Sequence, residues 1–214
     1  MSLIPALFLL LFPVWTANAQ VGAAAAPSYF GTLEVKRENL APFPKWTDAM
    51  LREARDRAGI PADCRPSFFT RCQWDDWKRL LADARASAPL AQLELVNRFV
   101  NKHPYITDPV NWGVDDYWTS IGQFFAKDGD CEDYAIAKFY TLRELGWDNE
   151  QMRIVVLQDQ NLKVAHAILV VQAGERTLVL DNQINQVVEA AAIRHYRPIF
   201  SLNETHWWLH RPPQ

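Results

Sequence analysis

The stretch "GDCEDYAIAKFYTLRELG", residues 129–146, indicates one helix with a cysteine at its first position. Asp130 is a good N-cap residue, Asp133 follows at the capping-box position, and Gly146 is a natural stop. Helical spacing places four residues on one side: Cys131, Ala135, Phe139 and Leu142. Because that side should face the core, we expect the Cys131 thiol at the buried corner of a helix N-terminus.

Four carboxylates lie close to this cysteine in the sequence: Asp128, Asp130, Glu132 and Asp133. Unopposed negative charge raises the pKa of a thiol, whereas helix N-terminal amides and a nearby imidazolium lower it. A bound cation would cancel the charge, and oxygen ligands from a loop and a helix start suit Ca²⁺. A solvated acidic cap that is favoured by the helix dipole needs no metal. The residues alone leave both interpretations open.

After this helix the hydrophobic period changes to two, which is typical of strands. Strands are predicted at 153–158, 163–172 and 176–183. Both alternating sets of "VAHAILVV" in the second strand are apolar, so we expect that strand to be covered on both faces. The order of helices first and strands afterwards favours an α+β fold with an antiparallel sheet.

The hairpin at "QAGERT", residues 172–177, sets which side chains of the last two strands meet. A loop of two or four residues places His166 opposite Gln183 and makes Asp181 a diagonal neighbour on the same face, with Cα atoms about 7–8 Å apart. A three-residue loop would turn Asp181 to the other face. The first register predicts a hydrogen-bonded His166–Asp181 pair, which is the arrangement that orients a base.

If the helix of Cys131 packs on that same face, the thiol, imidazole and carboxylate form a catalytic triad. A thiolate attacks a carbonyl, an imidazole transfers the proton, and a carboxylate holds the imidazole tautomer. Taken singly, each residue is more often a core cysteine, a satisfied strand histidine or a turn former. Their coincidence at a helix terminus favours catalysis. The Cys131 backbone N–H is one expected oxyanion donor, and the spacing identifies no second one.

The N-terminal region is predicted to be helical. One helix is expected at 46–59, with Thr47 as a possible cap and Gly59 as a stop, and two more at 73–103 with a break near Ala88–Pro89. A loop rich in Pro, Asn and Asp follows at 101–118 and leads to the cysteine.

Export is indicated by residues 1–19, an apolar run followed by a small-x-small site at Ala17 and Ala19. We expect a signal peptide that is cleaved after Ala19, with an uncleaved anchor as the alternative, and a single domain over 20–214. In an oxidising compartment Cys64 and Cys72 are expected to form a disulfide, although two free loop thiols stay open. The net charge of −3 and the absence of a Lys/Arg-rich tract argue against nucleic acid as a partner.

The motifs "GDCEDYAIAKFYTLRELG", "AHAILVV" and "LVLDNQ" resemble those of the bacterial transglutaminase-like cysteine peptidases, most closely the LapG-type periplasmic proteinases. The resemblance covers roughly residues 104–185. It implies a transglutaminase/papain-like core with a nucleophile at a helix N-terminus packed on an antiparallel sheet. It assigns Cys131 as nucleophile, His166 as base and Asp181 as orienting acid.

The same resemblance implies a cofactor, a substrate and a partner. It assigns Ca²⁺ to Asp130 and Glu132, with Asp133 as a further metal ligand. LapG-type proteinases cleave a large surface adhesin near its N-terminus in the periplasm, which disperses biofilm, and an inner-membrane receptor for cyclic di-GMP sequesters them. The resemblance also suggests that the aromatic segment with Trp112 and Trp118 walls the cleft, although both residues could simply be core.

Two other classes of function stay open. A transglutaminase or amidase would use the same triad, with a lysine amine instead of water resolving the thioester in the transglutaminase. A module that binds peptide or polysaccharide would use exposed tryptophans such as the pairs Trp74/Trp77 and Trp207/Trp208 as stacking platforms. His206 and His210 could face one way on a helix, but no third metal ligand is suitably spaced, and His103 has no identifiable partner.

Overall fold

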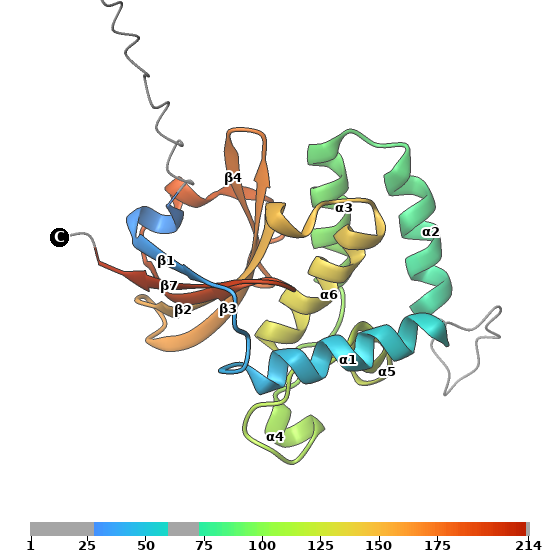
Figure 1. The fold of residues 1–214 in the computed structure, drawn as a ribbon. Coiled ribbons are helices and arrows are strands. Elements are labelled where there is room, and N and C mark those ends of the chain that lie inside the picture. The colour runs from blue at the N-terminus through green and yellow to red at the C-terminus, as the bar shows by residue number, and fades with distance from the viewer. Residues whose placement is uncertain (1–27, 60–72, 213–214) are drawn as a thin grey trace, which may run out of the picture.

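The helix that begins at Cys131 lies between a β-sheet and the other helices (Figure 1). The structure is a computed structural model that describes residues 28–59 and 73–212. The predicted signal peptide and the predicted Cys64–Cys72 disulfide lie outside these residues. No helix within the described ranges is both long enough and apolar enough to span a membrane.

Six α-helices are described, most of them on one side of the sheet. Their bounds are α1 Pro44–Ala58, α2 Gln73–Arg85, α3 Pro89–Val100, α4 Asp108–Asn111, α5 Ile121–Lys127 and α6 Cys131–Glu144. The break between α2 and α3 at Ala88–Pro89 is confirmed, because Pro89 occupies the first turn of α3, where a missing N–H has no cost. Thr47 does not cap α1, since the helix already begins at Pro44, while Gly59 does end it.

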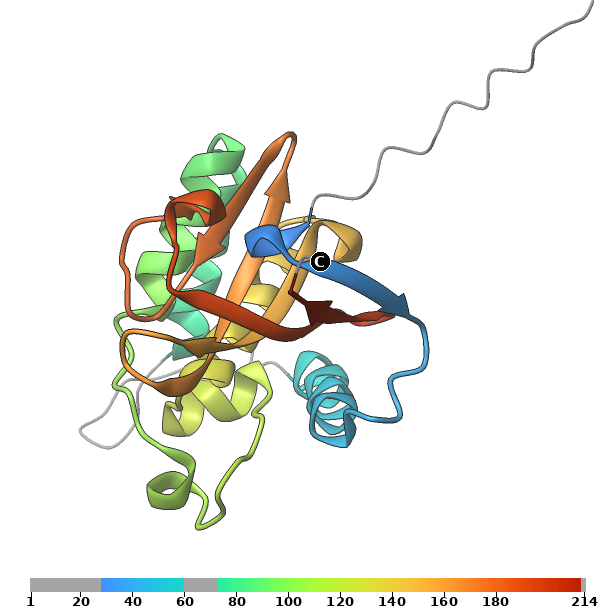
Figure 2. The same ribbon diagram turned by 90° about the vertical axis from the view of Figure 1, so that its left-hand side faces the viewer.

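Seven strands form one antiparallel sheet, which Figure 2 shows after a quarter turn. Their order is β1-β7-β6-β2-β3-β4-β5. Their bounds are β1 Leu33–Arg37, β2 Met152–Asp159, β3 Val164–Ala173, β4 Arg176–Leu180, β5 Val188–Glu189, β6 Tyr196–Leu202 and β7 Trp207–Arg211. The three predicted strands correspond to β2, β3 and β4. The α+β fold is therefore confirmed.

Strand β3 is covered on both faces, as its sequence predicts. Leu169 and Val171 belong to the large core that includes the apolar side of α6. Ile168 and Val170 belong to a second, smaller core on the other face, which also contains Tyr196. The sheet therefore separates two hydrophobic layers.

The chain between α3 and α6 contains more structure than the sequence predicts. One turn of helix, α4, lies inside the predicted loop, and α5 follows it with a capping box formed by Ser120 and Gln123. Helices this short are marginal on their own, so their apolar spacing gives little signal. Their effect is to bring Asp108 close to the start of α6, where Asp130 Oδ2 accepts a hydrogen bond from the Asp108 backbone N–H at 3.2 Å.

Candidate active site

His166 and Asp181 form the predicted pair. The hairpin has the two-residue turn Gly174–Glu175, so Ala173 pairs with Arg176 and Leu169 with Leu180. His166 Nε2 lies 3.0 Å from Asp181 Oδ1, and both side chains are buried. The strand itself ends at Leu180, three residues before the predicted end, and Gln183 uses its backbone N–H to bond Asp181 Oδ1 at 2.9 Å.

A tyrosine from a distant strand completes the environment of Asp181. Tyr196 of β6 donates its hydroxyl to Asp181 Oδ2 at 2.6 Å, and its ring lies edge-on to His166 with centroids 5.9 Å apart. Burial by itself would raise the pKa of Asp181, but the hydrogen bond and charge of His166, together with the bonds from Tyr196 and Gln183, hold that pKa below its usual value. Asp181 therefore stays ionised and can orient the imidazole. Sequence reasoning missed Tyr196 because the position of β6 in the sheet was not predicted.

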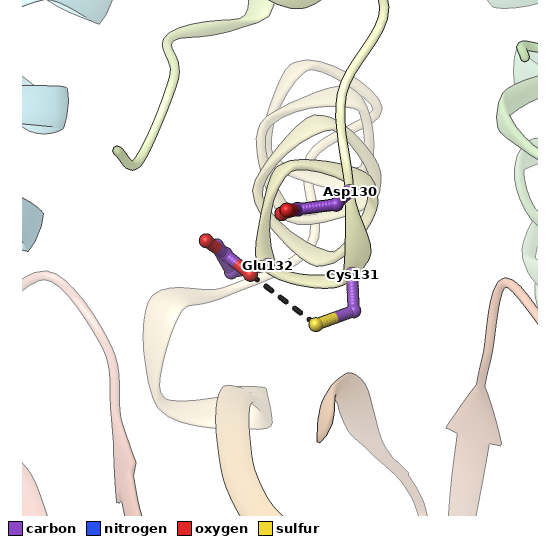
Figure 3. A group of neighbouring side chains, drawn as sticks. All are labelled: Asp130, Cys131 and Glu132. Carbon is purple, nitrogen blue, oxygen red and sulfur yellow. Dashed lines mark hydrogen bonds between the residues drawn. The ribbon is translucent and has the colours of Figure 1, made fainter. Parts of the chain in front are cut away.

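Cys131 occupies the first position of α6, as predicted, with Asp130 as N-cap. Its sulfur lies 3.2 Å from Glu132 Oε2, which Figure 3 shows as the dashed contact. The backbone N–H of Ala167, the residue after His166 in β3, lies near enough to the sulfur to lower the pKa of the thiol. The sulfur thus meets the strand next to the imidazole. In the described part of the chain, no hydrogen bond joins the Cys131 sulfur to His166.

The predicted packing face of α6 is wrong. The apolar side of α6 packs on the face that carries Leu169 and Leu180. His166 and Asp181 alternate with these residues, and Asp181 bonds Tyr196, which belongs to the other core. Both alternating sets of β3 are apolar, so the sequence pattern could not choose the face on which a helix packs. The start of α6 approaches β3 at the Ala167 backbone, beside His166.

The thiol is not activated by its present surroundings. Burial raises the pKa of Cys131 most, and the charges of Glu132 and Asp130 raise it further, whereas the Ala167 N–H lowers it. Burial and the negative charges beside Cys131 also raise the pKa of Tyr105, while the Cys131 backbone N–H, the expected oxyanion donor, lowers it. The carboxylates around Cys131 therefore raise the pKa of its thiol, as the sequence predicts for negative charge that no cation balances.

Two carboxylates that sequence reasoning missed join the cluster. Asp108 and Asp116 lie close enough to the others for their oxygens to share one ion: the groups are Asp108, Asp116 and Glu132, and Asp108, Asp130 and Asp133. Asp108 Oδ1 and Asp130 Oδ1 are buried without a hydrogen-bond partner in the described part of the chain. Such atoms normally have a partner, so they fit a cation. The sequence feature that could have identified these two carboxylates is the aspartate-rich loop "DPVNWGVDD" at 108–116.

The negative charges of these carboxylates repel one another. Burial, more than the nearby Asp130 charge, raises the pKa of Asp108 to about 6 and that of Asp133 to about 7. Burial and the charges of Asp130 and Asp133 raise the pKa of Glu132 to about 10. Buried carboxyls with raised pKa values are typical of functional sites, because structural carboxylates usually have partners that lower the pKa.

Comparison with known proteins identifies the family. A family model described as bacterial transglutaminase-like cysteine proteinase BTLCP matches residues 66–210, more than half of the chain. The chain belongs to this family. None of the curated proteins matches it.

Solved structures of one relative resemble this bacterial transglutaminase-like cysteine proteinase. Calcium-bound LapG from Legionella pneumophila is 33% identical, with a TM-score of 0.61, and the match covers 67% of this chain and 81% of that one. EGTA-treated LapG from the same organism is 33% identical, with a TM-score of 0.60 and coverage of 66% and 78%. The LapG-type resemblance is confirmed. The chain is a cysteine peptidase, and its substrate is a protein.

Asp133 has a different environment in this cysteine proteinase from that of the other predicted metal ligands. Its Oδ1 accepts the Thr119 N–H at 2.8 Å and its Oδ2 accepts the Asp130 N–H at 3.2 Å. The second bond is the capping-box contact that the sequence predicts. A Cβ at Gly129 would collide with this carboxylate, so only glycine fits there. Asp133 thus holds the loop before Cys131, and its role as a metal ligand stays a prediction.

The remaining sequence candidates have structural partners. His206 and His210 lie at the start of β7 and within it rather than on a helix: His206 contacts Thr205, and His210 contacts Ser201 at 2.8 Å. Trp118 lies in the large core, while half-buried Trp112 packs against Tyr117. Most described tryptophans are buried, and these are Trp46, Trp77, Trp118, Trp147 and Trp208. Stacking platforms for a polysaccharide are therefore not supported.

The raised carboxyl pKa values predict how stability depends on pH when calcium is removed. Asp108 and Asp133 bind protons more tightly in the folded state than in the unfolded state, so the free energy of unfolding falls as pH rises. We expect the unfolding temperature of EGTA-treated protein to increase on acidification from pH 8 to pH 5, across the values of about 7 and about 6. Added Ca²⁺ should stabilise most at pH 8. Thermal unfolding followed by circular dichroism checks both, and an unfolding temperature that falls steadily from pH 8 to pH 5 in EGTA would contradict the expectation.

Proposed function

We propose that this protein is a calcium-dependent cysteine endopeptidase that uses Cys131, His166 and Asp181. The observation that carries the proposal is the buried His166–Asp181 pair, 3.0 Å apart, beside the Ala167 backbone that the Cys131 sulfur contacts. Nε2 of His166 faces Asp181, which leaves Nδ1 for proton exchange with the thiol. Catalysis requires the Cys131 side chain to leave Glu132 and turn toward the imidazole of His166.

The roles follow from the chemistry of a thioester mechanism. The Cys131 thiolate attacks the scissile carbonyl carbon, and the proton that His166 takes from the thiol goes to the departing amine. Asp181 keeps the imidazole in one tautomer and stabilises its cationic form. Water then hydrolyses the acyl-enzyme, with His166 as general base, and releases the second product.

Ca²⁺ would be held by Asp130 and Glu132, with Asp108 and Asp116 as further ligands and Asp133 as a less direct one. All of these supply the hard oxygen atoms that calcium prefers. When bound, the ion supplies positive charge that opposes the carboxylates around the thiol. The buried, unpartnered oxygens of Asp108 and Asp130 support this fit, as does the calcium-bound form of the relative. Glu132, once engaged by the ion, would no longer compete for the Cys131 proton.

The cellular role extends the resemblance to LapG-type proteinases. In this proposal the protein is exported to the periplasm by residues 1–19 and cleaves a large surface adhesin near its N-terminus. Release of that adhesin would disperse biofilm, and an inner-membrane receptor for cyclic di-GMP would sequester the protease. The support is the sequence motif set and the 33% identity to LapG.

The test is incubation of the purified mature protein with surface proteins of its own cell, with and without EGTA. We expect a large surface protein to be shortened from its N-terminal side, and EGTA to prevent it. Mass spectrometry of the products identifies the cleaved bond. Crosslinked ladders, in place of shortened products, would indicate the transglutaminase alternative, because both reactions share the same thioester. Intact substrates at every calcium concentration would contradict the proposal.

A further inference from the structure

Asp128 has a backbone conformation that side chains rarely adopt. Its φ of 63° and ψ of −162° lie in a region that is essentially restricted to glycine. The residue ends α5 and stands three positions before Cys131, and its backbone N–H bonds the Phe124 carbonyl at 2.7 Å. A glycine would relieve this strain, so the presence of an aspartate indicates that its carboxylate makes an interaction that glycine cannot make.

The carboxylate forms a second buried histidine–aspartate pair. His103 Nδ1 lies 2.8 Å from Asp128 Oδ1, and both side chains are at most 7% exposed. The pair therefore ties the end of α3 to the residue that precedes the "GDCED" segment.

The ring of His103 is packed among aromatic side chains. Its ring stacks on Phe125, at 5.7 Å between centroids, and also packs against Phe124 and Phe99. The hydroxyl of Tyr134, three residues after Cys131 in α6, donates to the His103 carbonyl. The histidine is thus anchored to the helix that carries the nucleophile as well as to the loop before it.

The backbone of residues 128–130 is held by a hydrogen bond at each residue. Asn111 donates to the Asp128 carbonyl at 3.2 Å, and the Gly129 carbonyl accepts the Ile106 N–H at 2.9 Å. The Asp130 backbone N–H then donates to Asp133 Oδ2 at 3.2 Å. A change in the Asp128 backbone would therefore shift Gly129 and Asp130 together, and with them the calcium oxygens and the sulfur.

We propose that the His103–Asp128 pair is a positioning element that holds the strained turn before Cys131, and so sets the places of the sulfur and of the Asp130 and Glu132 carboxylates. This inference rests on the proposed function, because it concerns the same nucleophile and the same calcium ligands. His103 and Asp128 are positioning residues here, since neither is assigned a contact with substrate.

The decisive comparison is Asp128→Gly against Asp128→Asn, with Lys163→Gly as the matched control. Glycine relieves the strain but removes the acceptor, whereas asparagine keeps an oxygen for His103. Lys163 has a similar φ of 62° in the exposed turn between β2 and β3, so its glycine variant relieves strain elsewhere. We expect Asp128→Gly to lower kcat about 10-fold or more with little change in KM, and Asp128→Asn and Lys163→Gly to stay within about 3-fold of wild type.

Two further measurements do not depend on cleavage. Calcium affinity is measured by calorimetric titration with CaCl₂, and Cys131 reactivity by its rate of iodoacetamide alkylation, located by peptide mass spectrometry. Asp128→Gly should weaken calcium binding about 10-fold and change the alkylation rate, with thermal unfolding showing that each variant is folded at the assay temperature. His103→Asn, which keeps a donor near the Nδ1 position, should outperform His103→Phe.

The results separate this inference from the proposed function. Wild-type protein that cleaves nothing would contradict the proposed function, while the calcium and alkylation data would still test the pair. Wild-type calcium affinity and alkylation in Asp128→Gly would overturn the positioning role. The same conclusion would follow if Asp128→Asn lost as much as Asp128→Gly. Should His103→Phe fail to fold, the two Asp128 variants decide the matter.

Discussion

Replacing Cys131 with alanine is expected to lower kcat for cleavage by about 10⁴-fold or more, because the acyl-enzyme cannot form without the sulfur. Substrate capture should persist, since the substitution removes only the thiol group. A time course of product formation measures the first effect, and pull-down of the protein substrate measures the second. Residual binding with no cleavage would also provide a trapped complex that identifies the natural substrate.

The control for this substitution is Cys131→Ser, which keeps the size and polarity of the side chain. The hydroxyl is a far weaker nucleophile than a thiolate, so both variants should be inactive while their unfolding temperatures stay close to that of wild type. Cleavage by Cys131→Ala at the wild-type rate would remove this residue from the mechanism. The protein would then need a different nucleophile.

Removing calcium with EGTA is expected to lower turnover about 100-fold or more at pH 7, since a thiol with a raised pKa keeps little of the thiolate that attacks the substrate. The cause is the uncompensated charge of Glu132 and Asp130, which together with burial raises the pKa of Cys131. Excess Ca²⁺ should restore the rate fully. Initial rates at a series of free calcium concentrations give the measurement.

Matched carboxylate variants test whether the calcium effect comes from this cluster. Glu132→Gln and Asp130→Asn should behave like the EGTA-treated enzyme even in excess Ca²⁺. Asp115→Asn removes an exposed carboxylate from the same loop, outside the grouped oxygens, and should leave the rate unchanged. If EGTA left cleavage unaltered, the carboxylates would be a solvated cap of the helix and not a metal site.

The surroundings of Cys131 show which features the pattern of consecutive residues can predict. A helix from Cys131 with its cap, its stop and its core-facing side could be predicted because capping and 3.6-residue spacing are properties of consecutive residues. The His166–Asp181 pair could be predicted for a similar reason, since a two-residue turn sets the register of the two strands it joins. Both predictions needed only contacts that are short-range along the chain.

Other parts of the site arise from segments that are distant in sequence. Tyr196 reaches Asp181 because β6 pairs with β2, and Asp108 reaches the start of α6 through the short helix α4. The strain at Asp128 and its bond to His103 likewise depend on how α3 packs beside α5. No spacing rule connects these residues, because their proximity is a result of packing.

The sequence by itself determined the helix of Cys131, the register that joins His166 to Asp181, and the concentration of carboxylates around the thiol. Tertiary structure alone decided which face of the sheet this helix covers, and which distant side chains support the acid and the nucleophile loop. The physical reason is that β3 is apolar on both faces, so its pattern is equally compatible with either side. Only the competition of whole surfaces for burial selects one.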